Sequence, residues 1–290
     1  MTTTTPQRDP SPLIHRVLVG VDGTDPSIAA ADWAATLAQR LHAEVVLMDA
    51  LTRPYSEIAP PVDNAIRRSE QAHVAHDVAG DASLAGADIE VLEGEPSDTL
   101  AYAAGDAELV VIGSKDTEGL GHHGWFSLAH SLAHRTPCPM LVVPHDARPL
   151  HSTPTLLVGV DGSDGNQQAF EWTRRLAQQL GASVTAAFVT DPMYDTFDSA
   201  GSYGPEEVAA REEVANAPEV AFTEAAGMHT AATLQELAAD ANADMLIVSA
   251  RSRRSLDGLL LGRTPDELLH HPTCPTVIVP HGFTLGAAAA

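Results

Sequence analysis

The sequence predicts an α/β, Rossmann-like fold with two doubly wound domains, each a five-stranded parallel sheet with helices on both faces. Its 290 residues are enough for two domains of ordinary size. The segment 19–24 (VGVDGT) recurs as 158–163 (VGVDGS), and 137–139 (PCP) recurs as 273–275 (TCP). Within each half, short apolar runs alternate with amphipathic stretches, which is the pattern of parallel strands joined by helices. The chain is therefore interpreted as a tandem duplication.

The repeat also predicts the domain boundaries. The offset between the halves is 139 residues at first and 136 residues later, which indicates a short deletion in a surface loop. We expect a flexible tail at 1–13, a first domain at 14–146, a linker at 147–154, a second domain at 155–281 and a second flexible tail at 282–290.

The elements of the first half follow from its hydrophobic pattern. Apolar runs predict strands at 16–21, 44–48, 88–92, 109–113 and 140–143, and helices are expected at 27–41, 96–105 and 127–134. Ligands of such sheets bind beyond the carboxyl ends of the strands. The candidate sites are therefore the loops at 22–25 and 113–127 and their counterparts at 161–165 and 249–264.

Composition excludes several classes of partner. The chain has 16 basic and 39 acidic residues, a formal net charge of −23, so nucleic acid and anionic membranes are not expected to bind it. Residues 1–12 contain no apolar stretch typical of a signal peptide, and no apolar run approaches the length of a membrane span. Two cysteines are too few for a disulfide scaffold. We expect a cytoplasmic protein.

The repeated motifs resemble those of the universal stress protein family. Its members open with an apolar strand that ends in Val-Asp-Gly-Ser, as 160–163 does, and close with Pro-Cys-Pro followed by a strand, as 137–144 does. The resemblance implies an adenine nucleotide alpha hydrolase-like fold and two halves packed as a pseudo-dimer through their fifth strands. It also implies ATP as the ligand, with Mg²⁺ accompanying it, and places Asp22 and Asp161 beside the nucleotide. Val-Asp-Gly is equally typical of a structural turn.

Nucleotide-binding members of that family carry Gly, two residues, Gly, nine residues and Gly-Ser or Gly-Thr after the fourth strand. In the first half these positions fall on Gly113, Asp116 and Phe126, followed by Ser127. Gly113, Ser114 and Ser127 match the pattern, but Asp116 places a carboxylate where phosphates would bind, and two unit charges 4 Å apart repel by about 4 kcal/mol at an effective dielectric constant near 20. Triphosphate binding in the first half is therefore expected to be impaired.

The second half departs from the pattern in a different way. The three glycine positions fall on Ser249, Ser252 and Gly262, and Arg263 follows. A serine replaces a glycine poorly where the backbone needs a positive φ. However, the loop is basic, with arginines that suit an anion beside a helix N-terminus: Arg251, Arg253, Arg254 and Arg263. The alternative is that these arginines are solvated and pair with Asp257 and Asp266.

Histidines and cysteines suggest further chemistry. His130 and His134 lie one helical turn apart, a spacing that can present two metal ligands, but we expect them on the outer face of their helix without a metal. Cys138 and Cys274 precede the two fifth strands and are expected to be buried. If those strands meet, the two thiols could approach each other and act as a redox pair.

We interpret the chain as a non-catalytic regulatory or binding module of the stress response. It is expected to bind an adenine nucleotide, or another phosphorylated ligand, in the second half, to contact a protein partner not yet known, and to form a homodimer of tandem chains. Two alternatives stay open: a member that binds no nucleotide and acts through protein contacts, and a slow nucleotide hydrolase.

Overall fold

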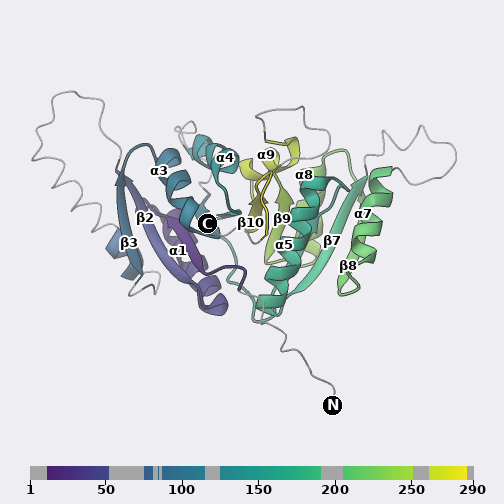
Figure 1. Ribbon diagram of the computed structural model, residues 1–290, viewed down its shortest axis with the longest axis horizontal. Helices are drawn as coiled ribbons and strands as arrows, with labels where there is room; N and C mark the ends of the chain where they lie inside the picture. The colour runs from purple at the N-terminus through teal and green to yellow at the C-terminus, as the bar shows by residue number, and fades with distance from the viewer. Residues whose placement is uncertain are drawn as a thin grey trace, which may run out of the picture.

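A computed structural model of the chain describes residues 12–51, 75–80, 84, 87–114, 125–190, 205–250 and 261–285, without the side chains of 125–127 and 164. The strands of these ranges join in one ten-stranded sheet, in the order β3-β2-β1-β4-β5-β10-β9-β6-β7-β8 (Figure 1). Every neighbouring pair is parallel except the central pair. The predicted α/β class with two five-stranded parallel sheets is confirmed.

The first domain contains five strands and three α-helices in its described part, and they lie where the hydrophobic pattern places them. Their bounds are β1 Arg16–Gly20, α1 Asp25–Leu41, β2 Glu44–Leu51, β3 Asp88–Glu93, α3 Pro96–Ala103, the short 3₁₀ helix η1 Ala104–Asp106, β4 Leu109–Gly113, α4 Trp125–Arg135 and β5 Met140–Val143. A further helical turn covers 75–80. Pro26 occupies the first turn of α1, where it lacks only an amide that the helix would leave unpaired.

The second domain repeats this order. Its elements are β6 Thr155–Gly159, α5 Asp164–Leu180, β7 Ser183–Thr190, α7 Pro205–Ala215, β8 Val220–Ala226, α8 Thr230–Asp240, β9 Met245–Ser249, α9 Arg263–His270 and β10 Thr276–Val279. Helix α5 begins after the N-cap Ser163, whose Oγ accepts a hydrogen bond from the Asn166 amide, and it ends at Gly181 in the left-handed conformation.

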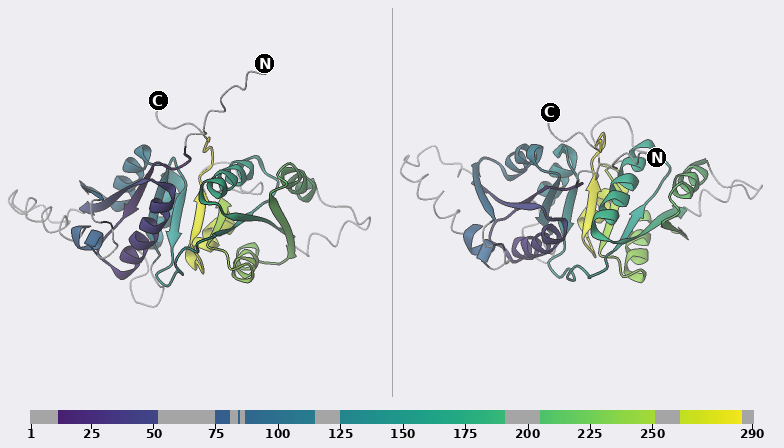
Figure 2. Two further views of the ribbon diagram at one scale, coloured as in Figure 1. Left: turned by 90° about the horizontal axis from the view of Figure 1, so that it is seen from below. Right: turned by 60° about the horizontal axis from the view of Figure 1, so that its bottom comes forward.

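The two domains meet strand against strand. β5 pairs with β10 in antiparallel register, with Met140 opposite Ile278 and Val142 opposite Thr276. The two parallel sheets therefore continue into each other across an approximate twofold axis, as Figures 1 and 2 show. The pseudo-dimer through the fifth strands is confirmed.

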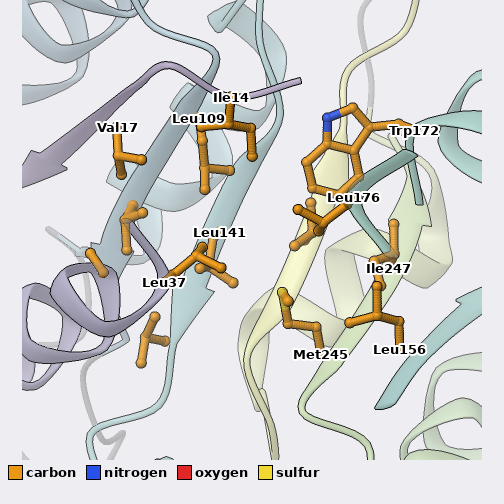
Figure 3. Packing of buried hydrophobic residues seen from close by; sticks show 14 of the residues in the cluster. Ile14, Val17, Leu37, Leu109, Leu141, Leu156, Trp172, Leu176, Met245 and Ile247 are labelled. Carbon is orange, nitrogen blue, oxygen red and sulfur yellow. The ribbon is translucent and has the colours of Figure 1, made fainter. Parts of the chain in front are cut away.

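Helices cover the sheet on both faces, over two apolar clusters. One cluster lies under α1, the 75–80 turn, α5 and α7, and the other lies under α3, α4, α8 and α9. Trp33 and Trp172, at matching positions of α1 and α5, are buried in the first cluster. Figure 3 shows that cluster near the junction, with Leu141 of β5 on one side and Trp172 and Leu176 of α5 on the other.

The segment between the domains is held by hydrogen bonds to both domains. The Arg148 carbonyl accepts a hydrogen bond from Trp33 Nε1 at 3.2 Å, and the Arg148 guanidinium donates to Asn242 Oδ1 in the second domain. Asp244 is buried and accepts hydrogen bonds from the His151 and Thr155 amides, both at 2.8 Å. Packing also continues beyond residue 281, because Phe283 and Leu285 lie against the cluster under α1 and α5.

Candidate functional site

Ligands of such sheets bind beyond the carboxyl ends of the strands, and in the first domain we call this region the first crevice; Asp22 lies there, two residues after β1. Asp22 Oδ1 accepts hydrogen bonds from the Thr24 amide at 3.0 Å and from the Thr24 hydroxyl at 2.6 Å. Ser27, in the first turn of α1, accepts a hydrogen bond from the Asp22 amide and donates one to the Thr24 carbonyl. The turn interpretation of Val-Asp-Gly thus describes this geometry, with the carboxylate held at the carboxyl end of the sheet.

A second carboxylate lies in the same crevice. Asp49, near the end of β2, is 3% exposed. Burial and the charge of Asp22 raise the pKa of the Asp49 carboxyl to about 6, and a hydrogen bond from the Ala50 amide opposes this shift in part. Sequence reasoning missed Asp49, although an acidic residue inside an apolar run could have indicated it. The carboxyl end of the first sheet therefore holds two carboxylates that repel each other, one of them buried.

Gly113 ends β4 at the centre of this crevice. A Cβ atom at Gly113 would lie 2.2 Å from the carbonyl oxygen of Pro26, so the glycine allows α1 to approach β4 closely. The next residue, Ser114, donates its amide to the Val143 carbonyl at 2.8 Å. Neither Gly113 nor its counterpart Ser249 has a positive φ. The argument that Ser249 loses a left-handed backbone is therefore wrong, and close packing is what requires Gly113.

The crevice of the second domain has the same plan. Asp161 Oδ1 accepts a hydrogen bond from the Ser163 amide at 3.0 Å, and the Asp161 amide donates to Asn166 Oδ1 at 3.3 Å. Asn166 also donates to the Gly159 carbonyl at 2.7 Å, which fixes the first turn of α5 against β6. Two glycines lie on this side. Gly162 has φ +68° in the loop and packs against the start of α7, where a Cβ atom would lie 2.5 Å from the Glu206 carbonyl oxygen, and Gly262 is the N-cap of α9.

The start of α9 closes the second crevice. The Gly262 amide donates to the Ala250 carbonyl at 2.8 Å, which holds the helix N-terminus against the end of β9. Arg263 is the first residue of α9 and its side chain is 75% exposed. It pairs with Glu267 at 2.6 Å, one turn along the helix, whereas Asp266, which the alternative interpretation named, lies against His130; Asp257 is outside the described residues. Arg263 would have to leave this exposed pair in order to contact a ligand.

A cleft of about 630 Å³ adjoins the second crevice, between α5 and α7. Gly162 and Ser163 form one end of it, and Glu171, Arg174 and Glu213 line its walls. Burial and the nearby charge of Asp161 raise the pKa of Glu213 to about 7, and its buried Oε1 has no hydrogen-bond partner. No feature of the sequence pointed to Glu213. A second cleft, of about 890 Å³, lies along α1 and the beginning of β2, away from the carboxyl ends of the strands.

Several predicted site residues lie outside the described part of the chain. These are Arg251, Arg253 and Arg254, together with the side chain of Ser127. The structure therefore brings together Asp22, Gly113 and Ser114 in one crevice, and Asp161, Gly262 and Arg263 in the other.

The histidine pair of α4 contacts the second domain. His134 is exposed, as expected, but its Nε2 accepts a hydrogen bond from the Leu261 amide at 3.2 Å. His130 Nδ1 lies 2.9 Å from Asp266 Oδ1 of α9. Among the described residues, no group of three His, Cys, Asp or Glu side chains is arranged to hold a metal ion.

The two cysteines are both buried and free, but they do not approach each other. In the antiparallel register of β5 and β10, Cys138 is level with Pro280, six positions from Cys274. Six residues of strand span about 20 Å. The idea that meeting strands bring the thiols together is therefore wrong. Burial also raises the pKa of Cys138 to about 12 and that of Cys274 to about 11, which suppresses thiolate chemistry.

Comparison of the sequence with known families gives two matches to one profile, described as the Universal stress protein family, over residues 14–144 and 153–280. The chain belongs to the universal stress protein family. It is a tandem member, because the two matches cover its two domains in turn.

Relatives of this universal stress protein share its full length. A universal stress protein of Mycobacterium tuberculosis is 27% identical over 293 residues, covering 91% of this chain and 96% of the relative. One from Mycolicibacterium smegmatis is 26% identical over 286 residues, covering 91% and 97% of the two chains.

Among solved structures, a universal stress protein of Archaeoglobus fulgidus covers 93% of this chain and 97% of its own length, with a TM-score of 0.70 and 16% identity. That likeness shows a shared fold. In the part of this universal stress protein that the structure describes, no helix combines the length and apolar character needed to cross a bilayer.

Proposed function

We propose that this universal stress protein is a regulatory binding module that takes an adenine nucleotide, or another phosphorylated ligand, in the crevice of its second domain. The observation that carries the proposal is the difference between the two crevices. The first holds Asp22 and Asp49 together, whereas β7 has Phe188 at the position that Asp49 occupies in β2.

Electrostatics favour the second crevice at neutral pH. With a pKa of about 6, Asp49 is mostly ionised at pH 7, so it adds a second negative charge beside Asp22. Glu213, near Asp161, has a pKa of about 7 and is about half neutral at that pH. A polyphosphate therefore meets less repulsion beside Asp161 than beside Asp22.

Backbone geometry supports the same choice. The N-cap of α9 is a glycine, Gly262, and no described side chain caps the Arg263 and Thr264 amides of the first helical turn. Helix N-termini with open amides stabilise phosphate groups. The residue that matches Gly262 at the repeat offset is Phe126, the second residue of α4 and a large side chain by sequence. When ATP is bound, Mg²⁺ would accompany it and offset part of the acidic charge of the crevice.

The proposal is one of binding rather than catalysis. Asp22 and Asp161 each use a carboxylate oxygen to hold the turn in which they lie. A carboxylate fixed in this way positions a loop or a ribose hydroxyl and is poorly placed to take a proton from a reacting group.

The test is to denature the purified chain, identify any nucleotide that is released, and then titrate the stripped protein with MgATP, ADP and AMP by calorimetry. We expect about one site per chain. Absence of both copurified nucleotide and heat would contradict the proposal and favour action through protein contacts. A steady release of phosphate in the presence of the protein would instead indicate the slow hydrolase.

A further inference from the structure

The helices α4 and α9 are equivalent elements of the two domains and they pack against each other at the junction (Figure 1). With the repeat offset of 136 residues, His130 matches Asp266 and His134 matches His270. The axis of the pseudo-dimer therefore brings His130 against its own counterpart, Asp266, at 2.9 Å. In a homodimer of one domain these two positions would carry the same residue. In the tandem chain one is a histidine and the other is an aspartate.

His134 extends this contact to the ligand crevice of the other domain. The Leu261 amide donates to His134 Nε2 at 3.2 Å, and Leu261 immediately precedes Gly262, the N-cap of α9. Leu261 is itself buried, with 8% of its surface exposed. The Gly262 amide in turn donates to the Ala250 carbonyl at the end of β9. The His134 side chain of the first domain thus fixes Leu261, which directly precedes the N-cap of α9 at the second crevice.

From this geometry we infer that His134 is a positioning residue for the second-domain ligand crevice, and that it couples ligand binding there to the state of the first domain. This inference rests on the proposed function. His134 fixes the path of the backbone from Leu261 to Gly262, and the open amides of α9 start from that point.

The hydrogen bond requires a particular form of His134. Because Nε2 accepts from the Leu261 amide, its lone pair must be free of a proton, so His134 is neutral and carries its proton on Nδ1. His130 Nε2 lies 3.4 Å from the same atom. A proton taken up at His134 Nε2 would face the Leu261 N–H group and would break this hydrogen bond.

The contact is therefore sensitive to pH, since histidine takes up its second proton between about pH 5 and 8. The titratable groups that face this network are His130 on α4 and Asp266 and His270 on α9. Glu213 and the phosphates of a nucleotide also titrate in this pH range, but their titration affects the parent chain and every His134 variant alike. The ratio of affinities between a variant and the parent chain at one pH isolates the effect of His134.

The experiment compares MgATP binding by the parent chain, His134→Gln and His134→Leu at pH 7.5 and pH 5.5. The glutamine carbonyl can accept from the Leu261 amide and does not titrate, whereas leucine cannot accept. At pH 7.5 we expect His134→Gln to bind like the parent and His134→Leu to bind about five-fold more weakly, the effect of one lost hydrogen bond. At pH 5.5 the parent should bind about five-fold more weakly than His134→Gln. His76→Gln, which replaces an exposed histidine of the 75–80 turn away from α4 and α9, is the control and should follow the parent at both values.

A second readout needs no ligand. Amide hydrogen exchange of Leu261 in the free chain should be slow in the parent and in His134→Gln, and faster in His134→Leu. Equal affinity ratios and equal Leu261 exchange in all variants would overturn the inference. If the parent binds no MgATP at either pH, the proposed function fails, and the exchange of Leu261 still decides whether His134 holds the second domain.

Discussion

Asp49 and Asp22 lie at the ends of neighbouring strands, and only one of them has a polar loop around it. Asp22 accepts two hydrogen bonds from Thr24, whereas Asp49 is buried near the end of an apolar strand. The raised pKa of Asp49 means that the folded chain resists ionising it. Its carboxylate therefore opposes folding at neutral pH, and it is retained at a strand end that borders a ligand crevice.

The pH dependence of this effect follows from the direction of the shift. In the unfolded chain Asp49 ionises with its ordinary pKa of 3.8, and in the folded chain it ionises with a pKa of about 6. The contribution of Asp49 to the free energy of unfolding therefore falls as pH rises through this window and is constant above it. Asp49→Asn should therefore stabilise the chain by about 1–3 kcal/mol at pH 7.5 and by little at pH 4. Denaturant unfolding at both values measures the difference. Equal gains at both pH values would show that the carboxylate charge is not the cause.

Individual site residues could be predicted from the sequence only where a motif carried them. Asp22, Asp161 and Gly113 lie at the carboxyl ends of the strands because the repeat placed those ends correctly. Asp49 and Glu213 were missed because their pKa shifts arise from burial and from a charge that is distant in sequence. The partner of Arg263 was missed for a simpler reason, because Glu267, one helical turn away, is a natural i,i+4 partner that was not considered.

At the scale of elements, the two domains differ in the residues at which the first helix packs against the fourth strand of each sheet. In the first domain the first turn of α1 contains Pro26 and the end of β4 is Gly113, and the Pro26 carbonyl fills the space that a Cβ would need. In the second domain the matching residues are Gly165 and Ser249, so the end of the strand there carries a Cβ atom. Because the nearest obstacle at Gly113 is the Pro26 backbone, the path of the helix backbone decides whether the strand end must be a glycine.

Substitutions at these pairs should have unequal effects. Gly113→Ser forces α1 away from β4 and should lower the free energy of unfolding by about 1–3 kcal/mol, the range for overpacked sites. Pro26→Gly combined with Gly113→Ser should recover little of that loss, because glycine keeps the backbone carbonyl that obstructs the new Cβ atom. The matched control, Ser249→Gly, should cost only about 0.5–1 kcal/mol through backbone entropy. Urea unfolding of the four chains tests this, and a Gly113→Ser chain as stable as the parent would contradict the packing argument.

The whole molecule is held at its centre by complementary positions of a duplicated sequence. β5 and β10 pair in antiparallel register, and α4 and α9 face each other with His130 against Asp266. A homodimer of either domain would place two histidines or two aspartates at this point. The contact between a histidine and an aspartate therefore favours pairing of the two unlike domains over pairing of two like domains.

This preference can be measured with a charge swap. At pH 6, His130→Asp should destabilise the chain by about 0.5–1 kcal/mol, because it sets two carboxylates against each other at a partly exposed site. Adding Asp266→His should restore stability, and Asp266→His alone should be intermediate. A double-mutant cycle gives the coupling free energy. A coupling of zero would mean that the pair does not contribute to the junction.

The fold of the whole molecule could be predicted from the sequence because most strands are apolar runs and the pattern of runs occurs twice. The junction through the fifth strands came from the family resemblance, since no local pattern specifies which strand edges meet. The fate of the cysteines could not be predicted, because it depends on the antiparallel register of β5 and β10. The contact between α4 and the second crevice likewise exists only when the two domains are packed together.

The central claim, that the second crevice is the ligand site, is tested most directly by exchanging the residues that differ between the two loops. Calorimetry with MgATP should be carried out on the parent chain, on Gly262→Phe, which carries the first-domain residue, and on Phe126→Gly as the matched control. The account predicts about one site per chain in the parent and in Phe126→Gly, and loss of binding in Gly262→Phe. Binding that survives in Gly262→Phe and is lost in a first-domain variant such as Asp22→Asn would place the ligand in the first crevice and contradict the account.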